Sequence, residues 1–482
     1  MRRTRCWSPR THDDLVVRSG RDAELYAIED AHVAFVAAST RAATSFWRVP
    51  PPAVHHRAVP TEYVRDQPDF FAVGPASAAA AIDMGSGIWC SPGMSSTYLI
   101  TTDDGRVVVN TGMWFEARTH KRNYDAVTTA PTHSIILTQS HTDHIGGVDT
   151  FREPQTRLIA QANIATCQAD DERIHGFRIR RSLPFFAAVM GQPGYARGDD
   201  AAILPVPTAA RADITFDDSY AFDCGGRRIE LISVPGGETI DSLVVWLPDD
   251  RVAFVGNMFS ALFGHFPNLV TMRGDRMRSA PAFVDSVQRV IDLGPELLLL
   301  GHHGPVRGAP RIRSECERIR DAVQYVHDAT VDAMNDGRDV WTAMRQIRLP
   351  DHLDLGEGYG RVDWSVRAIW ETYSGWFHQH STLDLYGAGP EEGAADIVEL
   401  AGGTEAVARR AAALIPSNPL AAIRLCELAL AVDAGHRGAL VAYRDAHERL
   451  LADDAHANFW LTRWLEGEVR SAQNRLERLD AT

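Results

Sequence analysis

The sequence has no run of eighteen apolar residues, so no segment is predicted to cross a lipid bilayer as a helix. Cysteine is scarce, with six residues in 482 and no Cys-x-x-Cys pair, so a disulfide framework is not expected and a reducing compartment is the simpler account. The first residues carry positive charge but no apolar stretch follows them, as a signal peptide would require. We therefore expect a cytoplasmic protein that does not bind membranes.

Basic residues are also fewer than acidic ones. The 63 acidic residues outnumber the 49 basic ones and give a net charge of −14, without any long basic stripe. This charge disfavours nucleic acid as a main partner, because phosphate groups would have to be neutralised. The chain also lacks a Gly-x-Ser-x-Gly nucleophile motif, a phosphate-binding loop and a dinucleotide-binding fingerprint.

The chain is too long for one ordinary hydrophobic core, and its texture changes along its length. Apolar strands alternate with helical patterns up to about residue 310, whereas strands disappear after residue 311. The pattern predicts an α/β layer fold followed by an all-helical region. We divide the chain into an N-terminal extension packed on the next domain (1–82), a catalytic domain (83–310), a helical dimerisation-type region (311–395) and C-terminal helical hairpins (396–482).

Local patterns predict individual elements. Residues 87–112 are expected to be paired strands with a hairpin at Asp103-Asp104-Gly105, and 281–294 a helix that stops at its glycine. An apolar stripe along 365–377 predicts another helix, and 404–470 predicts four short amphipathic helices in two hairpin-like pairs.

The stretch Thr-Gln-Ser-His-Thr-Asp-His-Ile-Gly-Gly (138–147) follows an apolar strand directly. It places His141, Asp143 and His144 in one tight loop, where imidazole and carboxylate suit zinc or a harder metal such as iron or manganese. Other strand ends offer Glu238, Asn257 and the pair His302 and His303. An α/β fold gathers its site at such strand ends, so a metal centre is predicted.

These motifs resemble the metallo-β-lactamase superfamily, whose first motif is His-x-His-x-Asp-His. The resemblance is closest to the alkyl sulfatase branch, through "SHTDHIGG", "PGGET", "NLVTMRG" and "YGRVDWSVRAIWETYSGWF", and it covers roughly residues 83–470. It implies an αββα sandwich, a homodimer and two metal positions. The first position would use Gln139, His141 and Glu238, with Glu238 in place of a third histidine. The second would use Asp143, His144 and one of the 302–303 pair, for which we favour His303 over His302.

The resemblance breaks at four positions. Gln139 replaces the first histidine of the motif, Asn257 stands where a bridging acid belongs, and Trp364 occupies the place of a proton-donating histidine. Asn110 replaces the aspartate of the usual Asp-Thr-Gly turn. Because an amide oxygen is a poorer ligand than imidazole or carboxylate, we expect one well-held zinc ion rather than two, with iron or manganese as alternatives.

We therefore expect a metal-dependent hydrolase in which Asp143 or Glu238 orients a water molecule and Arg273 holds an anionic group of a small-molecule substrate. The loss at Trp364 favours an ester, lactone, thioester or other anionic ester over a long-chain alkyl sulfate. Two alternatives stay open. One is an iron-dependent redox enzyme on the same scaffold, and the other is a non-catalytic dimeric binding protein with a decayed site.

Overall fold

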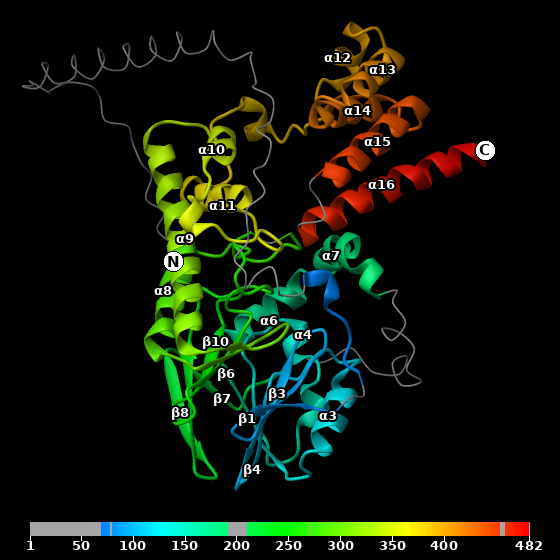
Figure 1. The fold of residues 1–482 in the computed structure, drawn as a ribbon. Coiled ribbons are helices and arrows are strands. Elements are labelled where there is room, and N and C mark those ends of the chain that lie inside the picture. Colours follow the sequence, from blue (N-terminus) through cyan, green and yellow to red (C-terminus); the bar gives the residue numbers. More distant parts are fainter. Residues whose placement is uncertain (1–68, 78–79, 191–209, 271, 454–457, 482) are drawn as a thin grey trace, which may run out of the picture. The chain divides into compact units, whose positions relative to one another are not determined.

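The computed structural model describes residues 69–77, 80–190, 210–270, 272–453 and 458–481 (Figure 1). All of them belong to one compact unit, residues 56–482. Most of the predicted N-terminal extension lies outside the described residues. No helix in the described ranges is long and apolar enough to cross a membrane.

The first sheet has seven strands in sequence order, antiparallel from β1 to β4 and parallel from β4 to β7. The hairpin predicted at Asp103-Asp104-Gly105 is present between β3 and β4. Asp103 and Asp104 form its turn and Gly105, at φ 115°, begins the second strand. The strands are β1 (Ile82–Gly85), β2 (Ile88–Ser91), β3 (Thr97–Thr102), β4 (Gly105–Val109), β5 (Thr132–Ile136), β6 (Arg157–Gln161) and β7 (Ile214–Phe216).

The second sheet has six strands in the order β13-β12-β11-β10-β9-β8, and only the β11–β12 pair is parallel. Alternate residues of β10 face opposite layers, as the two-residue period of a strand requires. Val245 packs into the core between the sheets and Val244 into the core beneath the helices. The strands are β8 (Ser219–Cys224), β9 (Arg227–Ser233), β10 (Leu243–Leu247), β11 (Val252–Gly256), β12 (Leu297–Leu300) and β13 (Val306–Arg307).

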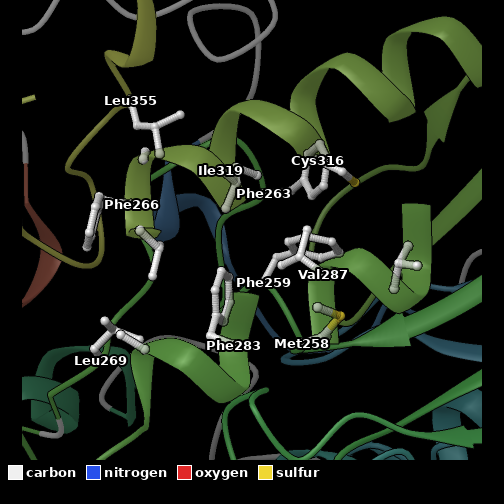
Figure 2. Close-up of a cluster of buried hydrophobic side chains, with 14 of the residues drawn as sticks. Met258, Phe259, Phe263, Phe266, Leu269, Phe283, Val287, Cys316, Ile319 and Leu355 are labelled. Carbon is white, nitrogen blue, oxygen red and sulfur yellow. The ribbon is translucent and has the colours of Figure 1, made fainter. Parts of the chain in front are cut away.

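Helices cover the outer face of each sheet, which completes the predicted αββα sandwich. The first sheet is covered by residues of α3 (Ala117–Asp125), α5 (Val148–Phe151) and α6 (Ile164–Arg173). The second is covered by α8 (Ala280–Leu293) and the long α9 (Ala309–Asn335). Figure 2 shows this second core, where Phe259 lies between Phe283 of α8 and Phe263. The predicted helix stop is confirmed, because Gly294 caps α8 in the left-handed conformation.

The rest of the chain is helical. The predicted helix at 365–377 is α11, which ends before Phe377, and the four predicted C-terminal helices are α13 to α16. Two further helices, the short α4 and the longer α7, lie within the first domain. The remaining helices are α4 (Thr142–Ile145), α7 (His175–Met190), α10 (Val340–Gln346), α11 (Val362–Ser374), α12 (Ala394–Leu400), α13 (Thr404–Leu414), α14 (Pro419–Val432), α15 (Arg437–Asp453), α16 (Phe459–Asp480), and the 3₁₀ turns η2 (Phe70–Ala72), η3 (Asp351–Leu353) and η4 (Thr382–Tyr386).

Close packing of strand ends shapes the edge where the polar residues gather. A Cβ atom on Gly301 would lie 2.0 Å from Asn257 Oδ1, so only glycine lets the β12 end approach the β11 end this closely. Ser96 of the β2–β3 loop donates its backbone N–H to the Gly301 carbonyl at 2.6 Å. The β2–β3 loop of the first sheet is thereby held against the ends of β11 and β12 of the second sheet.

Candidate metal centre

The histidine motif forms the start of a short helix at the end of β5. His141 is the N-terminal cap of α4, and Asp143 and His144 follow in its single turn. Ser95 donates its hydroxyl to the Asp143 backbone carbonyl. The backbone of Asn110, at φ 58°, is in the left-handed conformation, and its side chain bonds Thr138. Asn110 therefore joins the ends of β4 and β5, and asparagine tolerates that conformation better than most residues.

Asp143, His144 and His302 offer ligand atoms that all lie within 4.8 Å of one another. His302 Nε2 is 3.6 Å and His144 Nε2 is 3.4 Å from Asp143 Oδ2. The structure groups His302, and not the His303 that we favoured, with Asp143 and His144. The backbone of the neighbouring His303 is in the left-handed region (φ 63°).

The three donors fit a metal ion. Neither ring nitrogen of buried His144 has a hydrogen-bond partner among the described residues, and His302 Nδ1 has none either. Burial lowers the pKa of His144 to about 4, so its imidazole is neutral at pH 7 and its lone pair is free. Two imidazoles and one carboxylate with an open position are the ligands of a catalytic zinc site.

The remaining predicted ligands form a second group beside the first. His141 Nδ1 lies 3.2 Å from Gln139 Nε2 and 3.3 Å from Glu238 Oε2. Asn257 Nδ2 lies 3.1 Å from both Glu238 Oε2 and His302 Nε2, so this amide stands between the two groups. The structure thus brings together every ligand predicted from the sequence except His303.

Buried charges around the centre are balanced by arginine. Although burial opposes ionisation, Arg278 and His141 hold the pKa of Glu238 well below its usual range. The Arg278 guanidinium lies 3.4 Å from Glu238 Oε1 and also donates to the Glu238 backbone carbonyl at 2.8 Å. Arg273 makes a smaller contribution to lowering the pKa of Asp143 and Glu238, and its guanidinium lies over the Phe186 ring, 5.8 Å from the ring centroid.

Asp275 is a site residue that the sequence did not indicate. Its Oδ2 lies 3.1 Å from His141 Nε2 and 3.4 Å from Arg178 of α7. Burial alone would lower the pKa of His141, but the carboxylates of Asp275 and Glu238 outweigh it and raise the pKa to about 9. Asp275 lies two residues after Arg273 in a segment without periodicity, so only its closeness to Arg273 could have drawn attention to it.

An aromatic cluster borders the three-donor group and was also missed. Phe70 of η2 meets the His302 ring edge-on at 5.6 Å between centroids, and Tyr359 lies 4.9 Å from Phe70. Phe459, at the start of α16, packs 4.7 Å from Phe70. Trp364 packs against the same cluster. Segments from both ends of the described chain therefore exclude water from one side of the centre.

A cavity of about 610 Å³ reaches the second group. His141, Glu238 and Asp275 lie on its wall, and its mouth carries the exposed side chains of Phe177 and Met277. The cavity therefore gives solutes a route to the second group.

Comparison with known proteins identifies both halves of the chain. The family model of the metallo-β-lactamase superfamily matches residues 90–302, and that of the alkyl sulfatase dimerisation domain matches residues 342–468. A linear primary-alkylsulfatase from Pseudomonas sp. is 28% identical over 328 residues, which are 64% of this chain and 61% of that protein. An alkyl/aryl-sulfatase from Saccharomyces cerevisiae is 25% identical over 300 residues, 58% of this chain and 46% of that protein.

A solved structure shares the fold. The stereoselective inverting sec-alkylsulfatase from Pseudomonas sp. superimposes with a TM-score of 0.70 at 19% identity, covering 83% of this chain and 65% of that one. The chain thus spans about half to two thirds of the length of these relatives. The chain thus joins a domain of the metallo-β-lactamase superfamily (residues 90–302) to an alkyl sulfatase dimerisation domain (residues 342–468), and its curated relatives are alkylsulfatases.

Proposed function

We propose that this protein is a metal-dependent hydrolase that cleaves a sulfate monoester of a small alcohol. The observation that carries the proposal is the three-donor group of Asp143, His144 and His302, with unpartnered imidazole nitrogens, in an alkylsulfatase-like chain. These residues would hold one zinc ion. When bound, such an ion lowers the pKa of a water molecule and neutralises negative charge that develops in the reaction.

The other charged residues then have defined tasks. The Asp143 or the Glu238 carboxylate orients the attacking water. The Arg273 guanidinium, whose charge helps to lower the pKa of both carboxyls, is shaped to hold two oxygens of a sulfate group. The Phe70–Tyr359–Phe459 cluster keeps one side of the centre dry, which strengthens these electrostatic contacts.

Trp364, which stands where a proton-donating histidine was expected, is compatible with this function if water attacks the carbon atom of the sulfate ester. Inversion of configuration, as the name of the solved sec-alkylsulfatase states, requires that water attacks the carbon and that the carbon–oxygen bond to sulfate breaks. Sulfate then leaves with the electron pair, and no alkoxide has to be protonated. We infer the same bond cleavage here, because Trp364 cannot donate a proton as an imidazole would.

The test is a substrate panel with isotope tracing. Zinc-loaded protein is incubated in ¹⁸O-water with a secondary alkyl sulfate, a primary alkyl sulfate and a carboxylic ester, and the products are analysed by mass spectrometry. We expect sulfate release with ¹⁸O in the alcohol. The esters, lactones and thioesters favoured by the sequence have no support among the relatives, and turnover of a carboxylic ester without any sulfate release would overturn the proposal.

We also propose that the protein is a homodimer formed through the region matched by the dimerisation family model. Large apolar side chains are exposed there, including Tyr373, Trp376 (70% exposed) and Tyr386 (82% exposed). Their burial against a second copy would remove apolar surface from water.

A further inference from the structure

Arg273 differs from the neighbouring arginines in its polar contacts. Arg278 is paired with Glu238 at 3.4 Å, and Arg178 with Asp275 at 3.4 Å. The half-buried Arg273 side chain makes no hydrogen bond or ion pair with any residue that the structure describes. A guanidinium carries five N–H donors, so those of Arg273 are left for a ligand.

The contact that Arg273 does make is with an aromatic ring. Its guanidinium carbon lies over the Phe186 ring of α7, 5.8 Å from the ring centroid. At this distance the positive charge is attracted to the electron-rich face of the ring. Because the N–H donors lie in the plane of the guanidinium, a contact with its face leaves them free for an anion. Phe186 therefore restricts the orientation of Arg273 without occupying a donor.

The Phe186 ring is itself held by α16. The rings of Phe459 and Trp460, the first two residues of that helix, each lie 5.7 Å from Phe186. Both side chains are 1% exposed, and the Phe459 backbone N–H donates to the Gly358 carbonyl at 3.0 Å. The ring beneath Arg273 is therefore fixed in place by buried neighbours.

The same aromatic cluster reaches the three-donor group. Phe459 packs 4.7 Å from Phe70, and Phe70 meets the His302 ring at 5.6 Å. One continuous series of rings thus connects the surface that holds Arg273 to a metal donor. A site is more selective when the side chains behind its binding groups are rigid, because less orientational freedom is lost on binding.

We propose that Phe186 is a positioning residue whose ring, held by Phe459 and Trp460, orients the Arg273 guanidinium to bind the sulfate group of the substrate. That the anion is a sulfate ester rests on the proposed function. Phe186 touches no reacting atom and acts through Arg273 alone. The C-terminal helix α16 thereby contributes to substrate binding through the ring that it holds.

The test measures binding of inorganic sulfate to the full-length, zinc-loaded protein by isothermal titration calorimetry at low salt, since salt screens contacts with anions. Phe186→Leu removes the ring, and Phe186→Tyr keeps it. Phe185→Leu is the matched control, because Phe185 belongs to the same cluster and packs 5.0 Å from Trp460. Thermal denaturation establishes that each variant is folded.

We expect Phe186→Leu to raise the dissociation constant for sulfate about fivefold, equivalent to about 1 kcal/mol. Phe185→Leu and Phe186→Tyr should each change it by less than about twofold. In protein that already carries Arg273→Met, the substitution Phe186→Leu should cause no further loss, because both side chains act through one contact.

A purely structural role for Phe186 would give different results. Equal losses of sulfate affinity in Phe185→Leu and Phe186→Leu, or a loss in Phe186→Leu that persists with Arg273→Met, would overturn the proposal. So would unchanged affinity in folded Phe186→Leu, or no sulfate binding by the unchanged protein. Because this readout needs no turnover, it is independent of catalysis. Sulfate binding that depends on Phe186 and Arg273, in a protein that cleaves no sulfate ester, would refute only the proposed hydrolysis.

Discussion

Replacing His302 with asparagine should weaken metal binding strongly, whereas replacing His303 with asparagine should change it little. His302 belongs to the three-donor group, whereas His303 does not. Asparagine is a suitable replacement at both positions, because its amide is a poor zinc ligand and it tolerates the φ of 63° at residue 303. The two variants therefore differ in whether a proposed zinc ligand is removed, and neither introduces backbone strain at residue 303.

The size of the effect follows from the number of ligands. Structural zinc sites with four ligands bind with about 10–16 kcal/mol, so one ligand accounts for about 2.5–4 kcal/mol. For His302→Asn, that loss of free energy corresponds to a dissociation constant for zinc that is roughly a hundredfold to a thousandfold larger. For His303→Asn we expect a change of less than about threefold, equivalent to about 0.7 kcal/mol.

The assay is competition for zinc with a chromophoric chelator, with circular dichroism to establish that both variants are folded. The reasoning would be refuted if His303→Asn lost zinc and His302→Asn retained it. Equal losses in both folded variants would also contradict the assignment, since only one of the two side chains lies in the group.

Four further outcomes are expected. Phe283→Ala should lower the free energy of unfolding by about 3–5 kcal/mol in urea denaturation, whereas Leu400→Ala, at 89% exposed, should change it by less than about 0.5 kcal/mol. Although burial opposes it, hydrogen bonds to the first turn of α10 lower the pKa of Asp339, so Asp339→Ala should cost about 1 kcal/mol at pH 7, and this cost should shrink as the pH falls below about 4. Trp364→His should leave the rate of sulfate release within about threefold, because no alkoxide is protonated, and a larger gain would argue for sulfur–oxygen cleavage. Trp376→Asp should shift the protein toward monomer in analytical ultracentrifugation, and an unchanged mass would place the interface elsewhere.

The layer fold could be predicted because its signals are local. The apolar runs before Gln139 and before Gly301 are buried strands, and the turn at Asp103–Gly105 has the residues that a hairpin needs. Since strand ends of one fold meet at one edge, it was also predictable that the candidate residues at 141–144, 238 and 302 would lie close together.

The finer geometry could not be predicted, because it depends on backbone turns and on contacts between distant segments. His302 and His303 are adjacent and chemically identical, and only the fold shows that His302 lies with Asp143 and His144. Asp275 and Phe70 come from irregular segments, and only packing brings them to His141 and His302.

The measurement that tests the central claim most directly is metal content and sulfate release in the same samples. The protein is purified without added metal, beside His144→Ala, and is analysed by elemental mass spectrometry and with a secondary alkyl sulfate. We predict about one zinc ion per chain with sulfate release in the unchanged protein, and neither in His144→Ala. Equal zinc content and equal sulfate release in both proteins, or bound iron with no sulfate release in either, would contradict a zinc-dependent hydrolase built on Asp143, His144 and His302.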